Sequence, residues 1–395
     1  LYDRGVVYAN AHHAHANTET IVGHATLATG AHPADHGMVG NVWFDRREGR
    51  LVYNIEDAEY PLLSEGADVD KKTEIDPTQK AANVSGRSPR NILVSTFGDE
   101  LALHTAGKAK IFGVSVKDRG AVSMAGHAGR AFWFSKQTAQ FVTSTYYYDA
   151  YPDWVTAWNE QEKPFEYADS EWSLMADQSS YMFGDRDDRE GETELGDYGR
   201  VFPHPYGPAD SPYFTTLLTL SPAGDALTLD FAKALVEAED LGTDEIPDYL
   251  AISLSSTDYV GHYFGPSSLE SEDNMLRLDR LLAYLFAFLD TRVGLDQTLI
   301  VLSADHGAAE IPSYRRELGI PAGHVDVDNW DKAPGLAALE QRFGVGEPLI
   351  ASYDHPYLYL DRDVIQERGL EQGDVEAAVA EELMKLPGVA LAVSS

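Results

Sequence analysis

The first residue that could do chemistry is Thr20, a hydroxyl at the predicted start of a helix. The run 21–29 has helix-compatible spacing and ends at Gly30, which places Thr20 at about the N-cap. Backbone N–H groups at a helix N-terminus are unpaired, so they stabilise both a phosphate oxygen and a developing alkoxide. Thr20 therefore suits a nucleophile in phosphoryl transfer, although a plain capping role accounts for most threonines at such positions.

Two pairs of aspartate and histidine each follow a run of apolar residues. Asp258 and His262 are four residues apart, which puts both side chains on one face of a helix. Asp305 and His306 come just after the run 299–302, which we predict to be a buried strand. Each pair alone is better explained by a helix cap or a satisfied polar residue. Because open α/β sheets place ligand groups at the carboxyl ends of strands, the two pairs with a hydroxyl nucleophile indicate a two-metal phosphoryl-transfer site.

Two cations separated by one residue lie in the run Ser115-Val116-Lys117-Asp118-Arg119-Gly120. If 111–119 is one strand, Lys117 and Arg119 share a face and Asp118 points away. A lysine charge beside an arginine fork suits the oxygens of a phosphate dianion, while an exposed strand with solvated charges would give the same pattern. Upstream, the glycines before Asn41 predict a turn that returns its amide to the hydroxyl nucleophile.

The elements that must position these residues alternate between strand and helix, which predicts an α/β fold with a mostly parallel sheet. We predict strands at 5–11, 92–95, 111–116, 250–254, 299–302, 357–360 and 389–393, a hairpin at 43–54, and helices at 21–29, 99–103, 228–235, 278–289 and 375–386. The polar residues 56–91 are expected to loop over the surface. We expect one discontinuous catalytic domain over 1–395, with an aromatic-rich cap lobe at 121–211 and a smaller insertion at 309–348.

Composition limits the partners. Lysine and arginine number 30 against 64 aspartates and glutamates, a net charge of −34, which argues against nucleic acid and against anionic membranes. With 44% hydrophobic residues the chain is globular, and its longest apolar run, 281–289, is too short to span a bilayer. The absence of cysteine removes thiolate ligands and disulfides. The acidic run 185–197 is predicted to be a solvated loop, with a calcium site that lacks EF-hand spacing as the alternative.

The joint pattern resembles the threonine-nucleophile branch of the alkaline phosphatase superfamily, and most closely its phosphate-irrepressible bacterial type. The resemblance runs in order along nearly the whole chain and rests on Thr20 with Asn41 twenty-one positions later, Lys117-Asp118-Arg119-Gly120, Asp258 with His262, and Asp305-His306-Gly307. It implies that Thr20 attacks phosphorus and becomes phosphorylated while Asn41, Lys117 and Arg119 hold the phosphoryl oxygens. It also implies an α/β/α sandwich with inserted cap lobes.

The resemblance further implies two zinc ions per chain. Asp258 and His262 would belong to one, and Asp305, His306 and the Thr20 oxygen to the other. The family pattern also has an upstream aspartate and a last histidine near the C-terminus, and neither has a matching position here. We therefore expect these residues to lack both ends of the mature enzyme and each zinc site to be one ligand short. Small phosphate monoesters as substrates, a periplasmic or secreted location, and no nucleic-acid or membrane partner are implied too, with oligomeric state open and a monomer favoured.

Two alternatives stay open. A phosphodiesterase or nucleotide pyrophosphatase uses a similar threonine, asparagine and two-zinc core, and the paired cations argue against it because a diester carries one charge fewer. A sulfatase does not fit, because the run Thr20-Ile21-Val22-Gly23-His24 lacks the Cys/Ser-x-Pro-x-Arg setting of its nucleophile. A non-catalytic acidic metal-binding protein would fit the net charge, but it would not need the ordered nucleophile and cations.

Overall fold

The computed structural model describes residues 4–325, 327, 330, 333–345 and 349–394. The chain forms two compact units, one of Leu1–Val42 and Val52–Glu310 and the other of Trp43–Leu51 and Ile311–Ser395. The hairpin predicted at 43–54 is confirmed as β1 (Val42–Asp45) and β2 (Arg50–Tyr53), with Gly49 at φ 65° in its turn.

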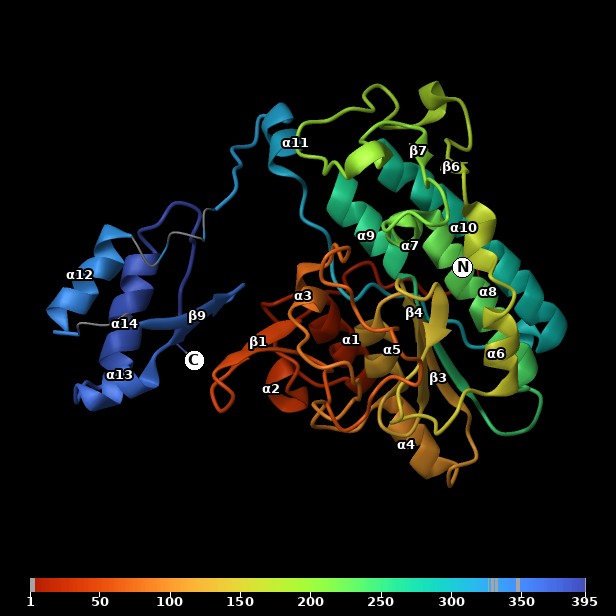
Figure 1. Ribbon diagram of the computed structural model, residues 1–395, viewed down its shortest axis with the longest axis horizontal. Coiled ribbons are helices and arrows are strands. Elements are labelled where there is room, and N and C mark those ends of the chain that lie inside the picture. The colour runs from red at the N-terminus through yellow and green to blue at the C-terminus, as the bar shows by residue number, and fades with distance from the viewer. Residues whose placement is uncertain (1–3, 326, 328–329, 331–332, 346–348, 395) are drawn as a thin grey trace. The chain divides into compact units, whose positions relative to one another are not determined.

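The larger unit contains most of the helices and strands (Figure 1). Its helices are α1 (Thr20–Thr29), α2 (Pro33–His36), α3 (Pro77–Lys80), α4 (Phe97–His104), α5 (Asp118–Ala125), α6 (Asp153–Asn159), α7 (Phe214–Thr219), α8 (Pro222–Ala238), α9 (Ser255–Phe264) and α10 (Leu269–Arg292). Its further strands are β3 (Ile111–Ser115), β4 (Arg130–Ser135), β5 (Gln140–Val142), β6 (Glu171–Trp172), β7 (His204–Pro205) and β8 (Tyr249–Ser253). Short 3₁₀ turns are η1 (Lys163–Tyr167), η2 (Gln178–Ser180), η3 (Gly196–Tyr198) and η4 (Leu295–Gln297).

A four-stranded sheet in the order β5-β4-β3-β8 organises this unit. Strand β3 pairs parallel with both β4 and β8, and β5 runs antiparallel at the edge. Helix α5 packs on β3 so closely that a Cβ at Gly113 would lie 2.2 Å from the carbonyl oxygen of Ala121. Helices α1 and α5 cover one face, and α8, which packs on β3 and β8 and against α9 and α10, covers the other (Figure 1). The predicted α/β/α sandwich is confirmed.

Aromatic side chains fill the space between the sheet and α8. The rings of Phe141 on β5 and Phe231 on α8 stack with centroids 4.2 Å apart, and Trp158 from α6 packs edge-on against both. The indole of Trp158 donates to Asp230, so its one polar atom is satisfied. Aromatic residues of the predicted cap lobe therefore pack onto the sheet itself.

Several predicted strands are wrong. Residues 5–11, 92–95, 299–302 and 389–393 do not form strands, and Leu299 and Val301 are 90% and 80% exposed. A strand forms only where its backbone groups find a partner. In the described part of the chain β8 ends the sheet and nothing pairs with its outer edge. The stretch 56–91 is a loop apart from α3, as predicted, but it is not confined to the surface, since Glu74, Asp76 and Arg87 are buried.

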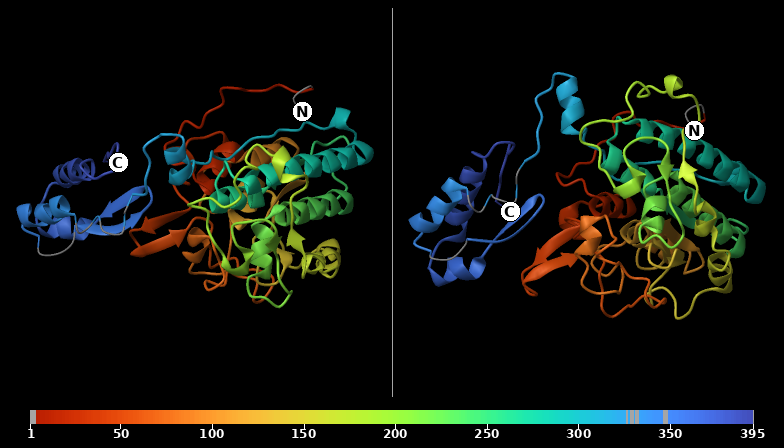
Figure 2. Two further views of the ribbon diagram at one scale, coloured as in Figure 1. Left: turned by 90° about the horizontal axis from the view of Figure 1, so that it is seen from above. Right: turned by 45° about the horizontal axis from the view of Figure 1, so that its top comes forward.

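The smaller unit is built on its own core. Strands β9 (Ile350–Asp354) and β10 (Tyr357–Leu360) form an antiparallel hairpin, and the remaining helices are α11 (Pro312–Glu317), α12 (Pro334–Arg342), α13 (Arg362–Glu367) and α14 (Gln372–Leu383) (Figure 2). Apolar residues of α12, α13 and α14 bury one another. Part of the predicted insertion at 309–348 lies outside the described residues, namely 326, 328–329, 331–332 and 346–348.

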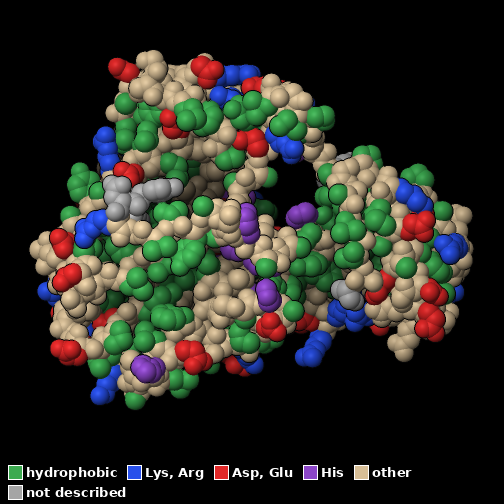
Figure 3. All heavy atoms as spheres, turned by 180° about the vertical axis from the view of Figure 1, so that it is seen from behind, with side chains coloured by type: hydrophobic (Ala, Val, Ile, Leu, Met, Phe, Trp, Pro, Cys, Tyr) green, Lys and Arg blue, Asp and Glu red, His purple; other side chains and the backbone are tan. Residues whose placement is uncertain are grey.

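The acidic charge is distributed rather than concentrated. On the face drawn in Figure 3, aspartate and glutamate side chains lie scattered among lysines and arginines. Among the described residues, none of the helices combines the length and apolar character that crossing a bilayer requires.

One buried carboxyl outside the predicted site predicts how stability changes with pH. Glu270, near the start of α10, is fully buried, and its Oε1 lies 3.2 Å from Nε2 of His204. Because Nδ1 of His204 donates to the carbonyl of Tyr198, a neutral imidazole presents Nε2 as an acceptor, and Glu270 then holds the proton. Burial raises the pKa of Glu270 to about 8 and lowers the pKa of His204, which favours this neutral pair.

The folded chain therefore keeps a proton on Glu270 that the unfolded chain loses near pH 4.5, so the free energy of unfolding falls as pH rises towards about 8. We expect Glu270→Gln, which keeps a donor to His204 without titrating, to be more stable than the wild type by about 2–4 kcal/mol above pH 8 and to match it below pH 4.5. Urea unfolding of both proteins across this range measures the difference. Parallel pH profiles would show that Glu270 is ionised in the folded chain.

Candidate active site

Thr20 is the first residue of α1 and is buried. The N-cap position belongs to Glu19, so the prediction that Thr20 is the cap is one residue too late. The turn after α2 brings Asn41 back to this helix end, where its Oδ1 accepts from the N–H of Ile21 at 3.0 Å. The N–H of Asn41 in turn donates to the Glu19 carboxylate at 2.5 Å. Asn41 thus caps the helix from outside and leaves the Thr20 hydroxyl free of a capping role.

Lys117 and Arg119 do not lie on one strand. β3 ends at Ser115, Lys117 is the N-cap of α5, and Arg119 lies in the first turn of that helix. The hydroxyl of Ser115 accepts from the N–H of Lys117 at 3.0 Å and helps to turn the chain there. Both cations nevertheless reach the same region. Nη2 of Arg119 donates to Oγ1 of Thr20 at 3.4 Å, and Lys117 forms an ion pair with Asp258.

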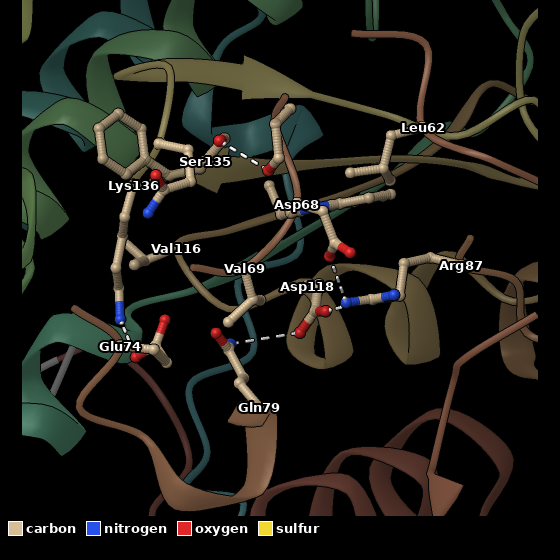
Figure 4. A pocket seen from close by; sticks show the side chains of 14 residues that line it. Leu62, Asp68, Val69, Glu74, Gln79, Arg87, Val116, Asp118, Ser135 and Lys136 are labelled. Atoms are coloured by element: carbon tan, nitrogen blue, oxygen red, sulfur yellow. Dashed lines mark hydrogen bonds and ion pairs between the residues drawn. The ribbon is translucent and has the colours of Figure 1, made fainter. Parts of the chain in front are cut away.

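Asp118 points away from the two cations, as predicted from their spacing, into a buried network that meets Arg119 through the hydroxyl of Tyr53. It accepts from the hydroxyl of Tyr53 at 2.6 Å and from Nε of Arg87 at 2.7 Å. Arg87 is 2% exposed and also reaches Asp68. Figure 4 shows Asp68, Arg87 and Asp118 around a cavity of about 30 Å³, which has room for one water molecule. The network ties the start of α5 to the long loop of residues 56–91.

The two predicted aspartate and histidine pairs come together. Asp258 and His262 lie one turn apart on α9, with Oδ1 of Asp258 3.3 Å from Nε2 of His262. The Nε2 atom of His306 lies 3.5 Å from the same oxygen and 3.5 Å from Oδ2 of Asp305. Residues far apart in the sequence therefore place two carboxylates and two imidazoles in one cluster beside Lys117.

Nearby cations keep both carboxylates of this cluster ionised. Burial alone would raise the pKa of Asp258, but the charge of Lys117 and the contact with His262 lower it well below its usual range. For Asp305 burial is outweighed by the contact with His24, and its pKa falls to about 2. Both carboxylates are therefore anionic at any pH near neutrality.

The sequence prediction missed His24. It lies one turn after Thr20 on α1, with Nδ1 2.8 Å from the Thr20 carbonyl and 3.0 Å from Oδ2 of Asp305. Its Nε2 lies 2.9 Å from Oγ of Ser253, at the end of β8. The spacing of four residues from Thr20 was the available signal, since it places both side chains on the same face of the helix.

The donor set has the chemistry that zinc takes. Carboxylate and imidazole are zinc ligands, with bonds of about 2.0–2.2 Å in a tetrahedron. Two ligands of one such ion lie roughly 3.3–3.5 Å apart, and the contacts of Asp258 with His262 and His306 have this separation. Oδ1 of Asp258 lies near both histidines, so the four side chains form one continuous cluster. Within the residues that the structure describes, no three His, Asp or Glu side chains are yet arranged to hold an ion.

Gly23 has no side chain, and the backbone of Asp305 packs directly against it. A Cβ at Gly23 would sit 1.9 Å from the carbonyl oxygen of Asp305, a backbone atom that cannot rotate away. We expect Gly23→Ala to displace Asp305 and weaken zinc retention at least tenfold, although alanine itself favours a helix by about 1 kcal/mol. Zinc per chain after dialysis, measured by atomic emission, tests this.

Gly261→Ala is the matched control, because Gly261 also lies in a helix of the site and has nothing within 4 Å of its added Cβ. It should keep its zinc and gain slight stability. Equal zinc retention in the two variants would contradict the role given to Gly23.

Comparison with known proteins now places the chain in a family. The family model for type I phosphodiesterase / nucleotide pyrophosphatase matches residues 1–394. The chain belongs to this family. It is also 36% identical over 398 residues to alkaline phosphatase PafA of Elizabethkingia meningoseptica, which covers 100% of this chain and 70% of that protein. Alkaline phosphatase PhoV of Synechococcus elongatus is 34% identical over 378 residues, covering 95% of this chain and 65% of PhoV.

Solved structures agree. The crystal structure of wild-type PafA matches with a TM-score of 0.83 and 35% identity over 96% of this chain and 69% of that one. A PafA variant with a TM-score of 0.84 carries substitutions of a threonine, an asparagine twenty-one positions later, a lysine, and an arginine two positions after the lysine. The predicted membership of the alkaline phosphatase superfamily is confirmed, and with it the assignment of this chain to a family of hydrolases.

Proposed function

We propose that this member of the type I phosphodiesterase / nucleotide pyrophosphatase family is a dizinc phosphomonoesterase, an alkaline phosphatase that works through a phosphothreonine at Thr20. The observation that carries the proposal is the contact of Arg119 with the Thr20 hydroxyl, with Lys117 beside the carboxylate and imidazole cluster. The similarity to PafA and PhoV supports it, as do the residue types substituted in the PafA variant, which match Thr20, Asn41, Lys117 and Arg119 in order.

In this proposal the chain's own residues bind, orient and attack. Oγ1 of Thr20 attacks phosphorus and forms a P–O bond as the bond to the leaving alcohol breaks. Arg119 and Lys117 hold the two negative charges that only a monoester dianion carries. In this proposal the amide NH₂ of Asn41 donates to the same oxygens, while its Oδ1 keeps the N–H of Ile21. Water then cleaves the phosphothreonine and restores the hydroxyl.

Asp258, His262, Asp305 and His306 are the residues that would hold zinc. When bound, zinc supplies positive charge that favours the Thr20 alkoxide and the leaving oxygen. We keep the predicted assignment of Asp258 and His262 to one ion and of Asp305, His306 and Thr20 to the other. A periplasmic or secreted location and the insertions at 121–211 and 309–348 remain part of the proposal, although β4 and β5 of the first insertion belong to the central sheet. Calcium at a structural site remains an alternative.

The second candidate is a phosphodiesterase, which the name of the family model favours. The two functions differ in the group that meets the paired cations. A diester puts an alkyl group where a monoester has a second charged oxygen, so two buried cations stabilise the monoester more.

The test compares kcat/KM for an aryl phosphate monoester with kcat/KM for the matching diester, using full-length protein supplied with zinc. We expect a ratio far above one. A ratio below one would assign the chain as a diesterase. Turnover of neither ester would favour a metal-binding protein, and many weakly bound zinc ions per chain would then distinguish storage from a two-ion site.

A further inference from the structure

Asp76 is a buried carboxylate that the proposed mechanism does not use. It is 6% exposed and lies in the loop of residues 56–91, directly before Pro77 and α3. Its Oδ2 lies 2.9 Å from Nη2 of Arg119, the same nitrogen that donates to Thr20. The loop of residues 56–91 thus supplies the counterion of Arg119.

The two oxygens of Asp76 have different partners. Oδ1 accepts from the N–H of Thr78 at 2.9 Å, from the hydroxyl of Thr78 at 2.6 Å and from the N–H of Gln79 at 3.4 Å, and it thereby caps α3. Oδ2 pairs with Arg119 and accepts from the hydroxyl of Tyr259 at 3.4 Å. The cap fixes the carboxylate, and the fixed carboxylate aims Oδ2 at the guanidinium.

Tyr259 extends this support to the second cation. Its ring lies under Nζ of Lys117, 4.1 Å from the ring centroid, while its hydroxyl contacts Asp76. Tyr259 is 3% exposed, and the carboxylate of Asp76 and the guanidinium of Arg119 are buried with it. Buried ion pairs with supporting hydrogen bonds hold a geometry that an isolated arginine does not.

We propose that Asp76 is the positioning residue that orients Arg119 towards the phosphoryl group and so sets the preference for monoesters over diesters. The inference rests on the proposed function. Arginine has several rotatable bonds, and its planar fork recognises two oxygens only in one orientation. Consistent with this role, burial would lower the pKa of Arg119, but Asp76 raises it well above its usual value, so the arginine stays charged.

Asp76→Asn separates positioning from capping. Three donors meet at Oδ1, so the amide oxygen of asparagine should take that position and keep the cap, which asparagine makes as well as aspartate does. The amide NH₂ then faces the guanidinium and cannot accept from it. Asp361→Asn is the matched control, because Asp361 caps α13 in the other unit by accepting from the N–H groups of Asp363 and Val364.

The experiment is a double-mutant cycle of Asp76→Asn with Arg119→Ala, measured as kcat/KM on the monoester and the diester. We expect Asp76→Asn to lower the monoester value about 10–100-fold and the diester value much less. In the Arg119→Ala background the same substitution should have no further effect, because the residue it positions is gone. Asp361→Asn should match the wild type.

Equal losses from Asp76→Asn in both backgrounds would overturn the proposal, since they would show a general structural role. Unchanged or faster monoester turnover in the single variant would overturn it too, by showing that the carboxylate only reduces the local positive charge. Calorimetry of inorganic phosphate binding to the wild type, the two single variants and the double variant separates failure of the positioning role from failure of the proposed function. If the phosphate affinities show the coupling expected of the cycle but no ester is turned over, the positioning role of Asp76 is supported and the phosphatase function is rejected. If none of the proteins binds phosphate, both are rejected.

Discussion

Replacing Thr20 by alanine is expected to abolish turnover of phosphate monoesters, with a loss of at least about 10³-fold in kcat. The reason is that the oxygen that attacks phosphorus is removed while the binding groups remain. Thr20 is 4% exposed and makes no capping bond with its side chain, so the loss of a hydroxyl and a methyl group should leave α1 in place. Initial rates with an aryl phosphate, with zinc content and melting temperature measured alongside, give the result.

Thr20→Ser is the control for this prediction. It keeps a hydroxyl at the same position and should retain most of the rate that alanine loses. Alanine and serine variants with the same residual rate would show that water attacks phosphorus directly. The role of the first residue of α1 would then be structural.

Replacing Lys117 by alanine is expected to remove the preference for monoesters. The monoester kcat/KM should fall about 10²-fold or more, because the second charge of the dianion loses its partner in a buried site. The diester value should change far less, since a diester has no such charge. The measurement is the ratio of the monoester kcat/KM to the diester kcat/KM. A lower fraction of active enzyme changes both values equally and so does not change the ratio.

Lys136→Ala is the matched control for Lys117→Ala. Lys136 is also a lysine over the ring of Tyr259, with Nζ 4.8 Å from the ring centroid, but it is only half-buried and its partner is Glu74 at 2.6 Å. Because it does not reach Thr20 or the predicted zinc ligands, it should leave the ratio of the two values unchanged. Collapse of the ratio in both variants would mean that the preference arises from the general positive charge around Tyr259.

The sequence indicated the fold class and the chemistry of the site better than it indicated the local structure around it. The helix that carries Asp258 and His262 followed from their spacing, and the structure has it as α9. The strand predicted through Lys117 and Arg119 was wrong, because the chain turns at the hydroxyl of Ser115 and continues as α5, which the missing side chain at Gly113 lets pack closely on β3. Periodicity could not show this, since the turn depends on one side-chain hydrogen bond and the packing depends on neighbours in space.

The missed residues have a common cause. Asp76 and Arg87 lie in a polar stretch that lacks periodicity, so the sequence favoured an exposed loop. Their burial depends on partners far along the chain, Arg119 and Asp118. The local signal that existed was Asp76-Pro77-Thr78, a helix start, which predicts a cap but not an ion pair with the second carboxylate oxygen.

Phosphorylation of Thr20 during turnover can be detected on the protein itself. Full-length protein supplied with zinc is mixed with excess aryl phosphate monoester, quenched in acid within the first turnovers, and mapped by peptide mass spectrometry. The account predicts the added mass of one phosphoryl group on the peptide that contains Thr20, and its absence from Thr20→Ala. Rapid turnover that leaves Thr20 unmodified at every quench time, or a phosphoryl group on another residue, would contradict it.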